Sequence, residues 1–144
     1  MTIALIALDG SENAMRAIDE VLDTMDTTKL HVHLLYVHEP VQINEVAFNT
    51  EPLLDMLRIN KAREEAGLAL LTPAKERLES AGIAFDAHIR SGNPAEVIND
   101  FSREYHCDLI VMGTRGMGTI KNLLLGSVAS KVVHLTEKPL LLVK

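Results

Sequence analysis

A run of glycines and hydroxyl residues follows an apolar segment in the last third of the chain. The apolar segment, residues 109–111, is typical of a buried strand, and residues 112–130 then read MGTRGMGTIKNLLLGSVAS. Glycines after a parallel strand let backbone N–H groups approach a ligand closely. A helix is expected over 128–135, directly after Gly126 and Ser127, and a helix N-terminus adds unpaired N–H donors with a partial positive charge. Together these residues predict an anion site that suits phosphate.

Two known phosphate-binding motifs do not fit these residues. A P-loop has Lys and a hydroxyl residue after its last glycine, whereas Gly118 is followed by Thr119 and Ile120. The dinucleotide fingerprint G-x-G-x-x-G, begun at Gly116, would need a glycine in place of Lys121. A further alternative, that the glycines serve only turns and close helix–strand packing, stays open.

The spacing of the glycines is more specific than their number. Two residues separate Gly113 from Gly116, and nine separate Gly116 from the pair Gly126 and Ser127. This G-x2-G-x9-G-[S/T] pattern resembles the nucleotide-binding signature of the ATP-binding branch of the universal stress protein family. The resemblance extends over the whole chain, from ALDGS at 7–11 to PLLLV at 139–143.

The resemblance implies an adenine nucleotide at the carboxyl ends of the first and fourth strands. The ligand would be ATP, with ADP or AMP as alternatives, and Mg²⁺ or Mn²⁺ would be held mainly through the phosphates, without an identified protein ligand. Asp9 would meet the adenosine end, although an Asx-type turn also explains this residue, and main-chain groups at Val37 would meet adenine. The expected binding residues are Ala7, Asp9, Val37, Met112, Gly113, Arg115, Gly116, Gly118, Gly126, Ser127, Val128 and Ser130.

The signature stretch carries no acid–base residue. Residues 112–131 contain no Asp, Glu, His or Cys, and efficient hydrolysis needs a positioned base or water-orienting group together with metal ligands. We therefore assign no catalytic residue. The resemblance implies a nucleotide-dependent regulatory protein of the stress response, with a protein partner left unidentified. The alternative is a slow ATP hydrolase or a nucleotidyl-transfer enzyme of the adenine α-hydrolase-like group.

The composition restricts the classes of partner. The net charge is −6, no basic run could track phosphates, and aromatic residues make up only 3% of the chain, so nucleic acid is not expected as a partner. No apolar run approaches the roughly 20 residues of a membrane span, and we expect no membrane insertion. The lack of a signal-peptide pattern and the single cysteine, Cys107, favour a cytoplasmic location.

Apolar runs and amphipathic segments alternate along the chain. Strands are expected at 3–8, 30–38, 83–90, 108–112 and 140–143, and helices at 12–25, 51–81, 94–105 and 128–135. This alternation predicts a parallel α/β sheet with right-handed crossovers and helices on both faces. Because ligands bind where the winding reverses, the first and fourth strands should be neighbours. The predicted fold is therefore a single doubly wound, Rossmann-like domain over 1–144 with strand order 3-2-1-4-5.

Two local patterns lead to further expectations. Pro73 should bend or split the helix over 51–81, and an apolar stripe of that helix should face inward. The stripe comprises Leu54, Leu57, Ala62, Ala66, Leu70, Ala74 and Leu78. His31 and His33 share one face of their strand, but no nearby Cys or acidic residue completes a metal site, so exposed histidines without a metal are expected.

Residues 140–143, LLLV, are apolar on both faces, although the predicted strand order places them at an edge of the sheet. An open apolar edge favours pairing with another chain. Two copies that meet across a two-fold axis would run antiparallel and satisfy each other's free backbone groups. We therefore expect a homodimer through this strand, as the family resemblance also implies.

Overall fold

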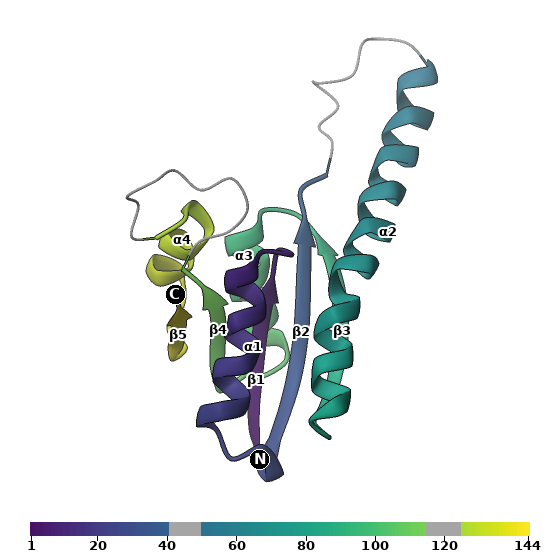
Figure 1. Ribbon diagram of the computed structural model, residues 1–144. Helices are drawn as coiled ribbons and strands as arrows, with labels where there is room; N and C mark the ends of the chain where they lie inside the picture. Colours follow the sequence, from purple (N-terminus) through teal and green to yellow (C-terminus); the bar gives the residue numbers. More distant parts are fainter. Residues whose placement is uncertain (41–49, 115–124) are drawn as a thin grey trace.

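The computed structural model of the chain describes residues 1–40, 50–114 and 125–144 (Figure 1). Its elements in chain order are β1 (Thr2–Leu8), α1 (Glu12–Thr24), the 3-10 turn η1 (Thr27–Lys29), β2 (Leu30–His38), α2 (Thr50–Ser80), β3 (Ala84–Ser91), α3 (Pro94–Glu104), β4 (Leu109–Gly113), α4 (Ser127–Leu135) and β5 (Leu140–Val143). Within these ranges we find no helix that is both long and apolar enough to cross a bilayer.

The strands form one parallel sheet in the order β3-β2-β1-β4-β5, which confirms the predicted order. β1 pairs with β2 on one side and with β4 on the other, where Ala7 lies opposite Met112. The chain therefore winds outward from β1 to β3, returns to the centre, and winds outward again through β4 and β5. This reversal places the carboxyl ends of β1 and β4 side by side (Figure 1).

Helices cover both faces of the sheet, and each face has its own apolar core. α1 and α2 pack on one face against Ala4, Ile6 and Leu8 of β1. α3 and α4 pack on the other face, against Leu5 and its neighbours. Because successive side chains of a strand alternate between the faces, a strand covered on both sides must be apolar throughout. This requirement explains the continuous apolar run of β1.

Side-chain caps fix two helix starts at the positions that the sequence predicts. The Oγ of Ser11 accepts a hydrogen bond from the N–H of Ala14 at 3.2 Å, and α1 begins at the next residue. The Oδ1 of Asn93 accepts a hydrogen bond from the N–H of Glu96 at 3.3 Å, and Pro94 lies in the first turn of α3. Such caps satisfy N–H groups that a helix leaves unpaired. The chain is thereby directed into a helix directly after β1 and after β3.

The sequence predicts that Pro73 bends or splits this helix; α2 continues through Pro73, so the split is wrong. Proline removes one N–H donor and crowds the preceding turn. Leu71, Ala74 and Leu78 flank this position and are buried in the core against the sheet. Burial of these side chains holds the helix in place on both sides of the proline and offsets its local cost.

The predicted apolar stripe of α2 is only half correct. Ala74 and Leu78 are buried, as expected, but Leu54 and Leu57 are 57% and 62% exposed, and Ala62 is also exposed. The first half of α2 extends beyond the sheet (Figure 1), and its Arg63 donates a hydrogen bond to the carbonyl oxygen of Glu39, just after β2. Apolar spacing therefore predicts the helix here but not the partner for its apolar side.

The close contact between α2 and β2 depends on Gly67. A Cβ atom at this buried position would lie 2.4 Å from Cδ1 and 2.6 Å from Cε1 of Tyr36. We expect Gly67→Ala to lower the free energy of unfolding by about 1–3 kcal/mol, the usual cost of overpacking. In an open helix the same change would instead stabilise by about 1 kcal/mol. Urea denaturation of the two proteins measures the difference.

A Tyr36→Ala background provides the control for this prediction. With the ring removed, the added methyl group has room, and only the helix propensity of alanine acts. Gly67→Ala should then be neutral or stabilising. A Gly67→Ala protein that is as stable as wild type while Tyr36 is present would contradict the proposed overpacking.

Cys107 is fully buried in the core between the sheet, α3 and α4. Burial raises the pKa of its thiol to about 11. Because the thiolate is the reactive form, we expect the native protein to resist an aromatic disulfide reagent at mildly alkaline pH. After unfolding in guanidinium chloride, one thiol per chain should react completely. Rapid stoichiometric reaction of the native protein would contradict this burial.

Candidate functional site

Two strand ends and one helix start converge where the winding of the sheet reverses. Asp9 follows β1, Gly113 ends β4, and α4 begins at Ser127 with Gly126 as its N-cap. The N–H of Gly126 donates a hydrogen bond to the carbonyl oxygen of Thr114 at 2.6 Å. This bond joins the two ends of the glycine motif, so the N-terminus of α4 lies directly beside the end of β4.

The first turn of α4 presents backbone donors. Gly126 makes no side-chain cap, and the turn contains no acidic residue. Ser127 is exposed, while Val128 and Ser130 are half-buried. The first N–H groups of a helix have no partner within the helix and carry a partial positive charge. This turn can therefore bind an anion through its main chain.

The backbone at Gly126 does not itself require glycine. Its φ of −68° and ψ of 169° are open to any residue. Ser, Thr, Asp or Asn at this position would satisfy one of the free helix donors with its own side chain. Glycine instead leaves those donors unoccupied and allows a ligand to approach the backbone closely.

Gly113, in contrast, has a packing reason to be glycine. A Cβ atom here would lie 2.9 Å from Cβ and 3.1 Å from the carbonyl carbon of Asn13, in the first turn of α1. The alternative of close helix–strand packing, which the sequence left open, therefore applies to this glycine. Gly113 also pairs with Val143 of β5, so it reaches the site as the end of a well-paired strand.

Asp9 forms an Asx-type turn at the end of β1. Its Oδ1 accepts a hydrogen bond from the N–H of Ser11 at 2.9 Å, and Gly10 between them adopts a positive φ of 84°. The turn holds the carboxylate at the strand end. Because Asp9 is exposed, its carboxylate can accept further hydrogen bonds from a ligand.

The other predicted binding residues are divided between described and undescribed parts of the chain. Ala7 and Met112 are paired neighbours in the two central strands. Val37 is half-buried near the end of β2. The predicted residues that lie outside the described ranges are Arg115, Gly116 and Gly118. The described part of the site therefore offers mainly main-chain groups and hydroxyls.

His38 is a residue that the sequence analysis missed. It ends β2, is only 9% exposed, and its Nδ1 is a buried atom without a hydrogen-bond partner among the described residues. Because β2 runs parallel to β1 as its neighbour, His38 and Asp9 both lie at the carboxyl ends of the strands. The sequence feature that could have identified His38 is a polar residue at the end of a mostly apolar strand.

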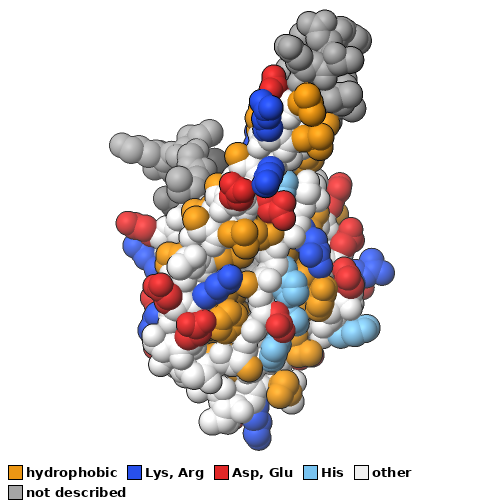
Figure 2. All heavy atoms as spheres, turned by 90° about the vertical axis from the view of Figure 1, so that its right-hand side faces the viewer, with side chains coloured by type: hydrophobic (Ala, Val, Ile, Leu, Met, Phe, Trp, Pro, Cys, Tyr) orange, Lys and Arg blue, Asp and Glu red, His pale blue; other side chains and the backbone are white. Residues whose placement is uncertain are grey.

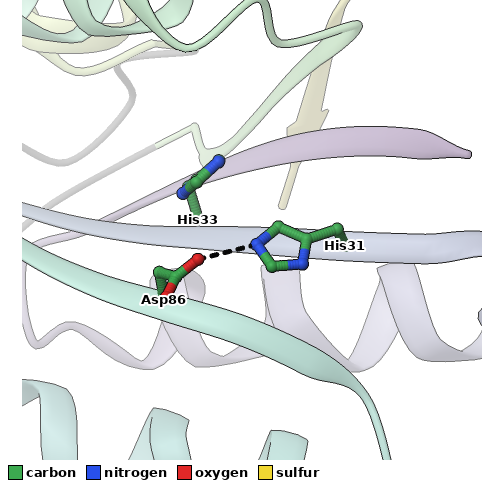
Figure 3. A group of neighbouring side chains, drawn as sticks. All are labelled: His31, His33 and Asp86. Carbon is green, nitrogen blue, oxygen red and sulfur yellow. Dashed lines mark hydrogen bonds and ion pairs between the residues drawn. The ribbon is translucent and has the colours of Figure 1, made fainter.

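A second group of polar side chains lies near the amino ends of β2 and β3, away from the carboxyl ends of the strands (Figure 3). The Nε2 of His31 is 2.9 Å from Oδ2 of Asp86, and one ligand atom from each of His31, His33 and Asp86 lies within 4.8 Å of the others. The expectation that no acidic residue lies near these histidines is therefore wrong, because the pairing of β2 with β3 brings Asp86 beside His33. His33 is also buried, at 7% exposure, rather than exposed.

Comparisons with known proteins agree with this architecture. The model of the universal stress protein family matches residues 1–144. Universal stress protein YxiE of Bacillus subtilis (strain 168) is 30% identical over 145 residues, which cover 97% of this chain and 97% of YxiE. The solved structure of MJ0577, a universal stress protein of Methanocaldococcus jannaschii, has a TM-score of 0.86 at 27% identity and covers 99% of this chain and 95% of that chain. The structure of a universal stress protein family protein from Arabidopsis thaliana with AMP bound has a TM-score of 0.70 at 22% identity and covers 100% of this chain and 92% of that chain.

The fold and the strand-end geometry define a doubly wound, Rossmann-like α/β protein with a candidate ligand site where the winding reverses. The family match over the whole length then gives the particular group. The chain belongs to the universal stress protein family.

Proposed function

We propose that this protein binds ATP at the carboxyl ends of β1 and β4. The observation that carries the proposal is the hydrogen bond from the N–H of Gly126 to the carbonyl of Thr114, which holds the free donors of α4 beside the end of β4. Phosphate groups suit a helix N-terminus and an exposed glycine backbone. The AMP bound to the Arabidopsis relative supports an adenine nucleotide as the ligand class.

In this proposal the triphosphate lies across residues 113–118 and 126–128. The hydroxyl groups of Ser127 and Ser130 add donors, and Arg115 adds a positive charge. Asp9 binds the adenosine end. The remaining contacts come from Ala7, Val37, Met112 and the motif glycines. Mg²⁺ or Mn²⁺ is held mainly by phosphate oxygens, which commonly supply most ligands of such ions, and ADP or AMP occupies the same place with fewer phosphates.

A regulatory role fits this site better than rapid catalysis. The described acid–base group directly after β1 or β4 is Asp9, which already accepts a hydrogen bond from Ser11, while the end of β2 has buried His38 and exposed Glu39. Efficient phosphoryl transfer to water needs a base or water-orienting group aligned with the γ-phosphate. The chain therefore acts as a nucleotide-dependent regulator in the stress response, and a protein partner detects whether ATP is bound.

Gly126→Glu tests the placement of the triphosphate. Because φ at this position suits any residue, the variant should fold, and a carboxylate near a helix N-terminus is itself favourable. Like charges placed together cost several kcal/mol, so we expect ATP affinity to fall by at least about 100-fold. Calorimetric titration with ATP, ADP and AMP, with and without Mg²⁺, measures the change.

Val133→Glu is the matched control for this variant. It adds the same negative charge to the same helix at an exposed position, about 9 Å along α4 from its first residue. This variant should bind ATP nearly as well as wild type. Wild-type affinity in a folded Gly126→Glu protein would overturn the proposed placement.

We also propose that two copies associate through β5. This strand lies at the edge of the sheet, and all four of its residues are apolar and half-buried. The carbonyls of Pro139 and Val143 accept hydrogen bonds from the N–H groups of Ile110 in β4 and Thr114 just after it. In a parallel pair, every second residue of a strand directs its N–H and C=O groups to the same neighbouring strand. The N–H and C=O groups of Leu140 and Leu142 are therefore directed to the open edge. A second β5 running antiparallel would satisfy those groups.

Leu142→Pro tests this interface without removing a hydrogen bond to β4. Proline on the open side of an edge strand is compatible with the sheet, but it removes an N–H that the partner strand needs. We expect wild type and Leu142→Val to be dimers at micromolar concentration by light scattering, and Leu142→Pro to be a folded monomer. A monomeric wild type, or a Leu142→Pro dimer, would exclude pairing through β5.

A further inference from the structure

Three histidines and one carboxylate gather on the sheet face that α3 covers. His31 and His33 share this face because alternate residues of a strand do so. The register of β2 with β3 places Asp86 beside His33, and His88 two residues further along β3. The Nδ1 of His33 lies 3.1 Å from Nε2 of His88, and His31 contacts Asp86 at 2.9 Å. Strand pairing thus brings together side chains from distant parts of the chain.

We propose that His31, His33 and Asp86 bind a divalent transition-metal ion such as Zn²⁺. Each residue offers one ligand atom, and these three atoms lie within 4.8 Å of one another (Figure 3). Zn²⁺ holds nitrogen and oxygen ligands at about 2.0–2.2 Å, so that tetrahedral ligand atoms are roughly 3.3–3.5 Å apart. Side-chain rotations that move a ligand atom by little more than about 1 Å would bring these groups to that geometry.

The donor set selects the class of metal. Two imidazoles and one carboxylate suit Zn²⁺, Ni²⁺ or Cu²⁺, whereas Mg²⁺ and Ca²⁺ prefer oxygen ligands throughout. A metal at this position is therefore chemically distinct from the Mg²⁺ or Mn²⁺ that would accompany ATP. It is also spatially distinct, because His33 precedes the end of β2 by five residues, a distance of about 16 Å along a strand.

The surroundings of His33 and His88 lower the pKa values of both imidazole rings. Burial lowers the pKa of His33, and the neighbouring histidines lower it further. Burial lowers the pKa of His88, and the positive charge of Arg90 lowers it further. The negative charges of Asp86 and Glu104 raise it.

His88 acts as a positioning residue for His33. Its ring nitrogen contacts Nδ1 of His33, and such a hydrogen bond fixes the tautomer and the orientation of a metal-binding imidazole. The rings of Phe101 in α3 and of its C-cap residue Tyr105, with centroids 5.7 Å and 4.9 Å from that of His33, pack on it and restrict its rotation. The buried ligand is therefore held before a metal arrives.

The other two ligands are open to solvent. The side chains of His31 and Asp86 are 25% and 59% exposed, and the view in Figure 2 shows histidine side chains grouped at this surface next to acidic ones. An ion can enter from this side, and water can complete its coordination. A bound ion would connect β2 to the edge strand β3.

Titration of the nucleotide-free full chain with Zn²⁺ tests the site. Any affinity tag is first removed, because it would compete for the metal. Metal already bound to the protein is stripped with a chelator, which is itself removed before the titration. We expect one Zn²⁺ per chain, bound tightly enough to compete with a chromogenic chelator. Co²⁺ should give the intense visible absorption of a tetrahedral site. Thermal unfolding should shift upward with Zn²⁺, because the ion binds only the folded arrangement.

Variants of the two exposed ligands make the test specific. His31→Gln and Asp86→Asn should each weaken Zn²⁺ binding more than tenfold while circular dichroism stays unchanged. His88→Ala should weaken it by about 10–100-fold, the usual effect of losing such a supporting group, and His88→Gln should recover part of the loss. His134→Gln, an exposed histidine on α4, is the matched control and should bind as wild type does.

The nucleotide site provides an independent reference. Gly126→Glu should keep full Zn²⁺ affinity, because the cluster uses no group from α4. Failure of wild type to bind Zn²⁺ at one ion per chain would overturn the proposal. So would equal affinity in wild type, His31→Gln and Asp86→Asn, since the metal would then be bound elsewhere.

Discussion

The central position of β1 is the constraint on which the rest of the structure depends. β1 is paired on both edges and covered by helices on both faces. Its pairing with β4 is closed at the amino end by Asp108, whose Oδ2 accepts a hydrogen bond from the N–H of Ile3 at 2.8 Å and whose N–H donates to the Ile3 carbonyl at 2.8 Å. At the carboxyl end, α1 after β1 and α4 after β4 lie on opposite faces of the sheet, as right-handed crossovers require. The space between the starts of these two helices is where backbone groups can meet a ligand.

Much of this fold could be predicted because its signals are local. The apolar run of β1 shows that both of its faces are covered, and Ser11 and Asn93 mark helix starts through caps that span only three residues. The strand order followed from one further step, since ligand signals after the first and fourth strands required those strands to be neighbours. This order leaves β3 and β5 at the two edges of the sheet.

What could not be predicted depends on contacts between distant segments. No local pattern places Asp86 beside His33, because this neighbourhood arises from the register of β2 against β3. In the same way, apolar spacing identifies α2 as a helix but does not show that the sheet ends before the helix does, which leaves Leu54 and Leu57 exposed. The unbroken passage through Pro73 likewise depends on core burial of Leu71 and Ala74. Local sequence patterns indicate which structure a segment prefers. In these three cases the outcome depends on tertiary packing.

The glycine motif itself contains two kinds of glycine, and only the structure separates them. At Gly113 a side chain would collide with Asn13, so the fold requires glycine there whether or not a ligand binds. At Gly126 the backbone conformation is ordinary, and a capping side chain would stabilise the helix at no conformational cost. Packing thus explains the first glycine, whereas the lack of a cap at the second agrees with the proposed ligand, which would use the same donors. A motif match alone weighs both positions equally, although Gly126 carries the stronger argument for binding.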